Sequence, residues 1–121
     1  MIEQIIKGMN HVTVDNSFTH YSTPALIVFS ERIITKMVND SRFVNIHSLF
    51  DELILYNDEL SKWFNSSSYN SPETIAKMDK TREKSIELLR LIAQRVGHIA
   101  KGNQSVIHEC GFYCNKHTEN C

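Results

Sequence analysis

Apolar residues recur with helical spacing over the second half of the chain. Ser71 can cap free backbone N–H groups at a helix start, and Pro72 has the fixed φ angle that suits a first helical position. Spacings of three and four place eight residues on one stripe of a helix, namely Ile75, Met78, Arg82, Ser85, Leu89, Ile92, Val96 and Ile99. Gly102 follows where helices commonly end in a left-handed residue. The pattern predicts a helix over about residues 71–101.

Two further apolar stripes precede this helix. One follows Asn45, which is placed to cap a helix, and it comprises Ile46, Leu49, Leu53, Tyr56, Leu60 and Trp63. The other follows Thr23-Pro24, again a capping residue before a proline, and it comprises Leu26, Phe29, Ile33 and Met37. They predict helices over about 45–65 and 23–39. Because residues 65–70 form a short polar loop, we expect an all-α fold, an antiparallel up-and-down three-helix bundle.

The chain ends carry mixed patterns. Residues 1–9 fit either a short fourth helix or an extended segment, and residues 11–15 alternate as in a strand. Residues 105–110 begin with β-branched side chains and then alternate, which predicts a second extended segment that can pair with the first. The predicted organisation is an N-terminal extension (1–22), a helical bundle (23–103) and an extended C-terminal segment with a Cys/His tail (104–121).

Composition narrows the class of protein. The chain has 121 residues, 41% of them hydrophobic and 22% charged, which is typical of a single globular domain. A formal net charge of −1 provides no overall field for a phosphate backbone or an anionic lipid, so we expect no nucleic-acid and no membrane partner. The start of the chain does not resemble a signal peptide, and no window reaches the apolar length of a membrane span. A cytoplasmic location is the expectation.

Two groups of residues resemble motifs of a known protein family. They are the turn Lys36-Met37-Val38-Asn39-Asp40-Ser41-Arg42-Phe43, and Ile99-Ala100-Lys101-Gly102-Asn103 with the following Val106-Ile107 and Gly111-Phe112. Over residues 24–113 the chain is similar to a family of uncharacterised bacterial helical-bundle proteins, some of which continue into a fibronectin type III domain. Cys110 departs from the serine or alanine usual before the second glycine. The resemblance implies a helical bundle and brings no activity with it.

The C-terminal tail holds the candidate metal ligands. Cys110, Cys114, His117 and Cys121, with His108 just upstream, could surround a tetrahedral zinc ion, although the spacings would make a very tight loop. The alternatives are incidental thiols on a terminus with few contacts after about residue 113, or a disulfide. We expect reduced thiols and no bound zinc, because chain ends fray and disulfides are rare in the cytosol.

Other polar residues fit structural roles. Arg82 lies on the apolar stripe, where it is expected to lay its methylenes on the core and extend its head group to water. Adjacent acids at 51–52 and 58–59 point about 100° apart on a helix, so a solvated face explains them. The sequence contains no phosphate-binding loop, nucleophile elbow or dinucleotide fingerprint, and its histidines are scattered. No positive signal therefore indicates an enzyme.

These observations favour a structural or protein-interaction module without enzymatic activity. The last predicted helix is longer than its partners, so part of its apolar stripe needs cover from the chain termini or from another chain. We therefore expect self-association as a homodimer. The competing hypothesis is a small metal- or redox-responsive protein that uses the tail thiols.

Overall fold

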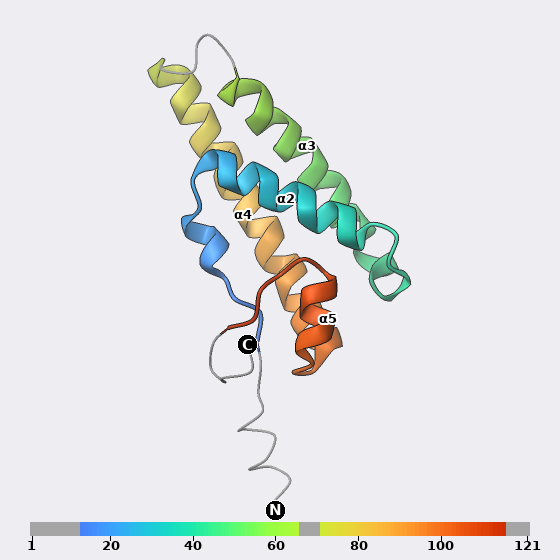
Figure 1. Ribbon diagram of the computed structural model, residues 1–121. Helices are drawn as coiled ribbons and strands as arrows, with labels where there is room; N and C mark the ends of the chain where they lie inside the picture. Colours follow the sequence, from blue (N-terminus) through green and yellow to red (C-terminus); the bar gives the residue numbers. More distant parts are fainter. Residues whose placement is uncertain (1–12, 66–70, 116–121) are drawn as a thin grey trace, which may run out of the picture.

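The computed structural model describes residues 13–65 and 71–115, and three long helices dominate it (Figure 1). They are α2 (Thr23–Met37), α3 (His47–Phe64) and α4 (Pro72–Ala100). A short helix α5 (Gln104–Glu109) follows α4, and the 3-10 helices η1 (Ser17–His20) and η2 (Ser41–Ile46) precede α2 and α3. Helix α3 packs against both α2 and α4, with opposite chain direction to each. The predicted all-α, antiparallel up-and-down bundle is confirmed.

Serine caps and prolines set where two of the long helices begin. Ser71 Oγ accepts a hydrogen bond from the Thr74 backbone N–H at 3.1 Å, as predicted, with a proline in the first turn of α4. The corresponding cap of α2 is Ser22 rather than the predicted Thr23, and its Oγ accepts from the Ala25 N–H at 3.3 Å. Helix α4 ends at two residues with positive φ, Lys101 and Gly102.

Helix α3 begins differently from the prediction. Asn45 is not its cap, because the chain already turns through η2 before α3 begins and the N-cap position falls on Ile46, which makes no side-chain cap bond. The polar cap lies one element earlier, where the Asp40 carboxylate accepts from the Arg42 backbone N–H at 3.0 Å. The sequence pattern did not separate η2 from α3, because the apolar residues of η2 run directly into the apolar stripe of α3.

The two ends of the described chain pair with each other. Val14 and Cys114 form an antiparallel bridge, with Asp15 N–H donating to Tyr113 O at 2.8 Å and Asn115 N–H donating to Thr13 O at 2.7 Å. The prediction that the segment over 11–15 pairs with residues 105–110 is wrong in its partner, because the bridge forms with the residues around Cys114 instead. The prediction of few contacts after residue 113 is wrong for Cys114 and Asn115, and residues 116–121 lie outside the described range, as does the alternative of a helix over 1–9.

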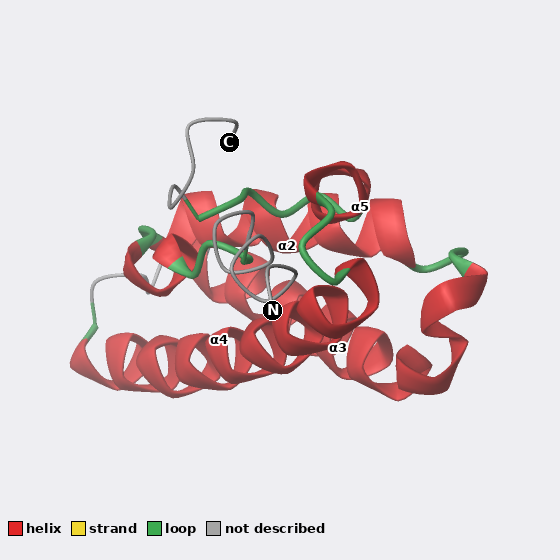
Figure 2. Cartoon of the chain, turned by 90° about the horizontal axis from the view of Figure 1, so that it is seen from below, coloured by secondary structure: helices red, strands yellow, loops and turns green. Residues whose placement is uncertain are grey.

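The predicted extended segment over residues 105–110 is instead mostly the helix α5. Asn103 caps it by accepting from the Ser105 backbone N–H at 2.9 Å, and Ile107 is fully buried. A good cap and a buried contact outweigh the β propensity of the local sequence, which depends strongly on context. Beyond α5 the chain runs alongside α2 (Figure 2).

Three phenylalanines from distant segments form an aromatic cluster in the core. Phe18 of η1, Phe29 of α2 and Phe112 lie with ring centroids 5.5 to 6.2 Å apart, and Phe18 and Phe112 are fully buried. Gly111 makes the approach possible, because its φ is +96° and an added Cβ would lie 3.1 Å from Ile33 Cδ1. Both chain ends therefore complete the core instead of merely lying on it.

Removing the Phe112 ring should destabilise the whole domain. We expect Phe112→Ala to lower the free energy of unfolding by about 3–5 kcal/mol, because a fully buried ring would leave a cavity lined by the other two phenylalanines. Val44→Ala, at a side chain that is 66% exposed, should change it by less than about 0.5 kcal/mol. Urea unfolding followed by circular dichroism measures both, and equal effects would contradict the role given to Phe112.

Candidate functional site

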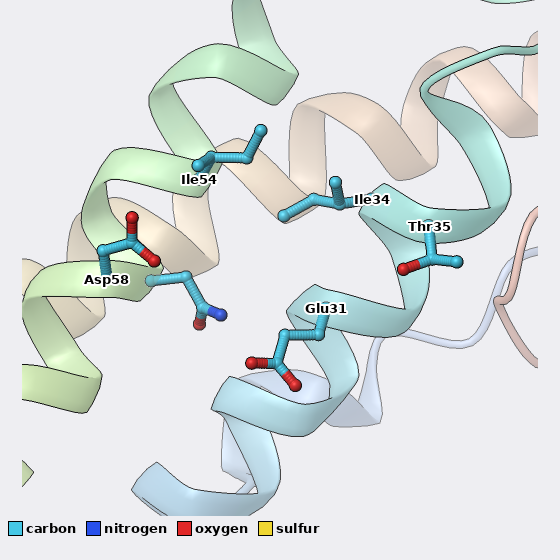
Figure 3. A pocket seen from close by; sticks show the side chains of 6 residues that line it. Glu31, Ile34, Thr35, Ile54 and Asp58 are labelled. Carbon is cyan, nitrogen blue, oxygen red and sulfur yellow. The ribbon is translucent and has the colours of Figure 1, made fainter.

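A hollow of about 190 Å³ lies between α2 and α3. Its lining residues are Glu31, Ile34 and Thr35 of α2, with Ile54, Asn57 and Asp58 of α3. Figure 3 shows Ile34 and Ile54 extending toward one another, while the carboxylates of Glu31 and Asp58 point into the space between the two helices. The hollow therefore has an apolar part and an acidic part. We refer to it as the α2–α3 hollow.

Asn57 gives this hollow a buried polar atom. The residue is only 4% exposed and lies on the otherwise apolar face by which α3 joins the core. Its Nδ2 donates to the Ile27 backbone oxygen at 3.3 Å. This contact assigns the nitrogen of the carboxamide and leaves Oδ1 as the acceptor. The acceptor, Oδ1, is covered and has no hydrogen-bond partner in the described structure. Such buried, unsatisfied acceptors are uncommon in folded proteins and call for a physical explanation.

The acidic groups of the hollow have no cationic partner among residues 13–65 and 71–115. The ion pairs among the described residues join Arg42 to Asp40 and Glu109, and Arg90 to Glu87, so neither Glu31 nor Asp58 is included. Helix α3 carries four acidic side chains and a single lysine. The α3 wall of the hollow therefore carries more negative than positive charge.

Exposed apolar side chains lie on the same two helices as the hollow. Val28 precedes Glu31 by one helical turn and is 64% exposed, and Leu55 precedes Asp58 by one turn and is 56% exposed. Ile54, in the lining, is 37% exposed. Exposed apolar side chains beside polar groups are typical of a binding surface.

Sequence reasoning missed this site. It assigned residues 58–59 to a solvated face, and Asp58 is indeed exposed, but its position beside Glu31 depends on how α2 and α3 pack. One signal was present in the pattern. The apolar positions Phe50, Leu53, Leu60 and Phe64 surround a helical position that holds Asn57, a carboxamide where the spacing calls for an apolar residue.

The tail residues do not form a metal centre in the described structure. Cys110 is a free, fully buried thiol, and Cys114 is disulfide-bonded, so these two sulfurs do not present a pair of thiolates to a zinc ion. His108 is exposed, with its Nε2 3.4 Å from Cys114 Sγ. His117 and Cys121 lie outside the described residues. The expectation of reduced thiols is wrong for Cys114, and the zinc hypothesis stays a prediction.

Other candidate residues have structural roles. The Arg82 head group does not extend to water as predicted, because one nitrogen donates to the Tyr21 backbone oxygen and Nη1 is buried. Arg42 joins η2 to α5 by pairing with Asp40 at 2.6 Å and with Glu109 at 3.1 Å. This pairing holds the pKa of the Asp40 carboxyl below its usual value. These contacts hold elements together, and they line no hollow described here.

Comparisons with known proteins add no assignment. No protein-family model matches the chain, and neither the curated proteins nor the solved structures searched contain a significant match. Among the described residues, no helix has the length and apolar character needed to cross a membrane.

The buried thiol gives a direct test of the tail geometry. Burial raises the pKa of Cys110 to about 11, so at pH 8 its reactive thiolate is scarce as well as covered. We expect iodoacetamide to modify Cys110 in the native chain about a hundredfold or more slowly than in urea. Peptide mass spectrometry measures the rates. A cysteine introduced by Ser105→Cys on the exposed side of α5 is the control, and equal rates at the two positions would contradict the burial.

Proposed function

We propose that this chain is a non-enzymatic helical module that binds protein through the side formed by α2 and α3. One observation carries the proposal, namely an acidic hollow whose carboxylates form no ion pair with the described residues, on two helices that also expose Val28 and Leu55. Binding surfaces commonly combine an apolar centre with polar groups that fix orientation. The proposed surface spans two helices that pack against each other.

Self-association remains part of this proposal, but a different surface now supports it. The sequence argument assumed that the long helix lacks cover, yet α5 and the chain ends pack on its C-terminal half, where Val96 and Ala100 are buried. Ile75 and Leu91 of α4 stay 41% and 40% exposed. They face different directions, because sixteen positions on a helix correspond to a rotation of about 160° beyond whole turns. The α2–α3 side, with the more exposed Val28 and Leu55, is the stronger candidate for contact.

The family resemblance and the cytoplasmic location are also parts of the proposal. The resemblance rests on residues that have structural roles. Met37 and Phe43 are buried at the turn after α2, and Gly102 and Gly111 have positive φ angles. Such positions support a shared type of bundle. They do not indicate a ligand, so the proposed function rests on the α2–α3 side alone.

Light scattering after size exclusion tests the self-association. At tens of micromolar we expect a mass near twice the 14.0 kDa of one chain. Leu55→Glu should return the protein to a single chain, because it removes apolar contact and adds charge to an acidic surface. Val44→Glu, at a 66% exposed position of η2, serves as the control and should leave the mass unchanged. A wild-type chain that is strictly monomeric at these concentrations would contradict the prediction.

A further inference from the structure

We propose that the disulfide of Cys114 is a redox-active site that a dithiol reductant opens, with Cys114 leaving as a thiolate that His108 stabilises. The proposal does not depend on the interaction function proposed above. Three observations carry it: the contact between His108 and the Cys114 sulfur, the cover over Cys114, and the burial of the free thiol of Cys110.

The imidazole of His108 offers a hydrogen-bond donor to one sulfur of the disulfide. Its Nε2 lies 3.4 Å from Cys114 Sγ. A disulfide sulfur carries no hydrogen and can only accept, so this contact requires the hydrogen to be on Nε2 of the ring. Hydrogen bonds to an ionised group are about twice as strong as those between neutral groups. The contact therefore stabilises Cys114 more as a leaving thiolate than as part of the intact bond.

Elements anchored in the core hold the two side chains together. His108 lies in the last turn of α5, whose start is capped by Asn103. The chain then turns at Gly111, which has a positive φ angle, and runs back to the bridge that Cys114 forms with Val14. Because α5 and the bridge both pack on the bundle, the donor and the sulfur are placed before any reductant arrives.

Burial decides which sulfur is attacked and where the reductant comes from. Cys114 is only 5% exposed, so an incoming thiolate is kept from its Sγ and attacks the sulfur bonded to it. Cys110 does not supply the attacking thiolate from within the chain. It is fully buried, and burial raises the pKa of its thiol to about 11, which makes its thiolate scarce. The reductant is therefore a separate molecule.

A dithiol balances the exchange. One of its thiols loses its proton to solvent and attacks the sulfur bonded to Cys114. The S–S bond breaks, and its electron pair leaves on Cys114 Sγ. The second thiol of the reductant also loses its proton, displaces the sulfur held in the mixed disulfide, and closes the reductant's own disulfide. The disulfide of the chain thereby gains two electrons and, from water, two protons, while the dithiol is oxidised.

Reduction of the full chain by dithiothreitol at constant pH tests the role of His108. Samples are quenched in acid, alkylated with iodoacetamide in urea, and weighed as intact protein to follow the opened disulfide. We expect His108→Phe, which keeps a ring of similar size and lacks the N–H donor, to open about threefold to tenfold more slowly than the wild type. His108 is exposed, so the substitution does not endanger the fold. His20→Phe, at an exposed histidine of η1, is the matched control and should open at the wild-type rate.

Equilibrium with glutathione separates stabilisation of the thiolate from mere cover of the bond. A side chain that only shields the disulfide changes the rate of opening and leaves the equilibrium where it is. A donor that stabilises the Cys114 thiolate also favours the reduced chain. We therefore expect His108→Phe to need a more reducing ratio of glutathione to glutathione disulfide for half reduction, with the equilibrium constant changed about threefold or more.

The mixed disulfide shows which sulfur leaves. After brief reaction with glutathione, peptide mass spectrometry should find Cys114 as a free thiol without a glutathione adduct. An adduct on Cys114 would overturn the proposal, because Cys114 would then be the sulfur attacked. So would an unchanged equilibrium in His108→Phe, an equal slowing in His20→Phe, or a disulfide that dithiothreitol opens only in urea.

Discussion

The packing of Phe112 against Phe18 and Phe29 brings three distant parts of the chain to one point. Phe18 precedes the first long helix, Phe29 lies in its middle and Phe112 follows the last helix. The antiparallel bridge between Val14 and Cys114 lies between the same two chain ends. Because the rings are buried, the ends belong to the core, and the C-terminal half of α4 obtains from within the chain the cover that a partner would otherwise supply.

The position of the arginine next to Glu31 also bears on the charge of the α2–α3 hollow. Arg32 follows Glu31 directly in α2, and it is the nearest basic residue in sequence. Its guanidinium instead lies over the Tyr113 ring at 4.8 Å, and Nη1 donates to the Tyr113 hydroxyl at 2.8 Å. Because successive helical residues point about 100° apart, Arg32 faces away from Glu31, and Tyr113 holds its guanidinium there. Glu31 forms no ion pair with any described residue.

Local patterns were sufficient to predict the helices. Serine and proline at 71–72 and the three apolar stripes gave type, order and bounds to within about two residues, because these signals act over one or two helical turns. The segment over 105–110 was misassigned because the cap at Asn103 and the burial of Ile107 outweigh a local β preference. Asn45 was misread as a cap because η2 was not foreseen.

The candidate site could not be predicted in the same way. Glu31 and Asp58 are 27 positions apart, and only the packing of α2 on α3 brings them to one hollow. Each looks like an ordinary surface acid when its own helix is considered alone. Asn57 was the one available signal, a polar residue on an apolar stripe, but its meaning depends on an unsatisfied oxygen that only a three-dimensional structure shows. The cysteines of the tail drew attention because their spacing is visible in sequence.

The central claim is that the chain ends are part of one cooperative core, and native-state hydrogen exchange tests it most directly. The amides of Asp15 and Asn115 donate across the bridge between the ends, and Leu89 lies in the fully buried part of α4. The account predicts that the Asp15 and Asn115 amides exchange only with global unfolding, with the same protection as the Leu89 amide. Rapid exchange at Asp15 and Asn115 while Leu89 stays protected would show that the ends open independently, and would contradict the claim.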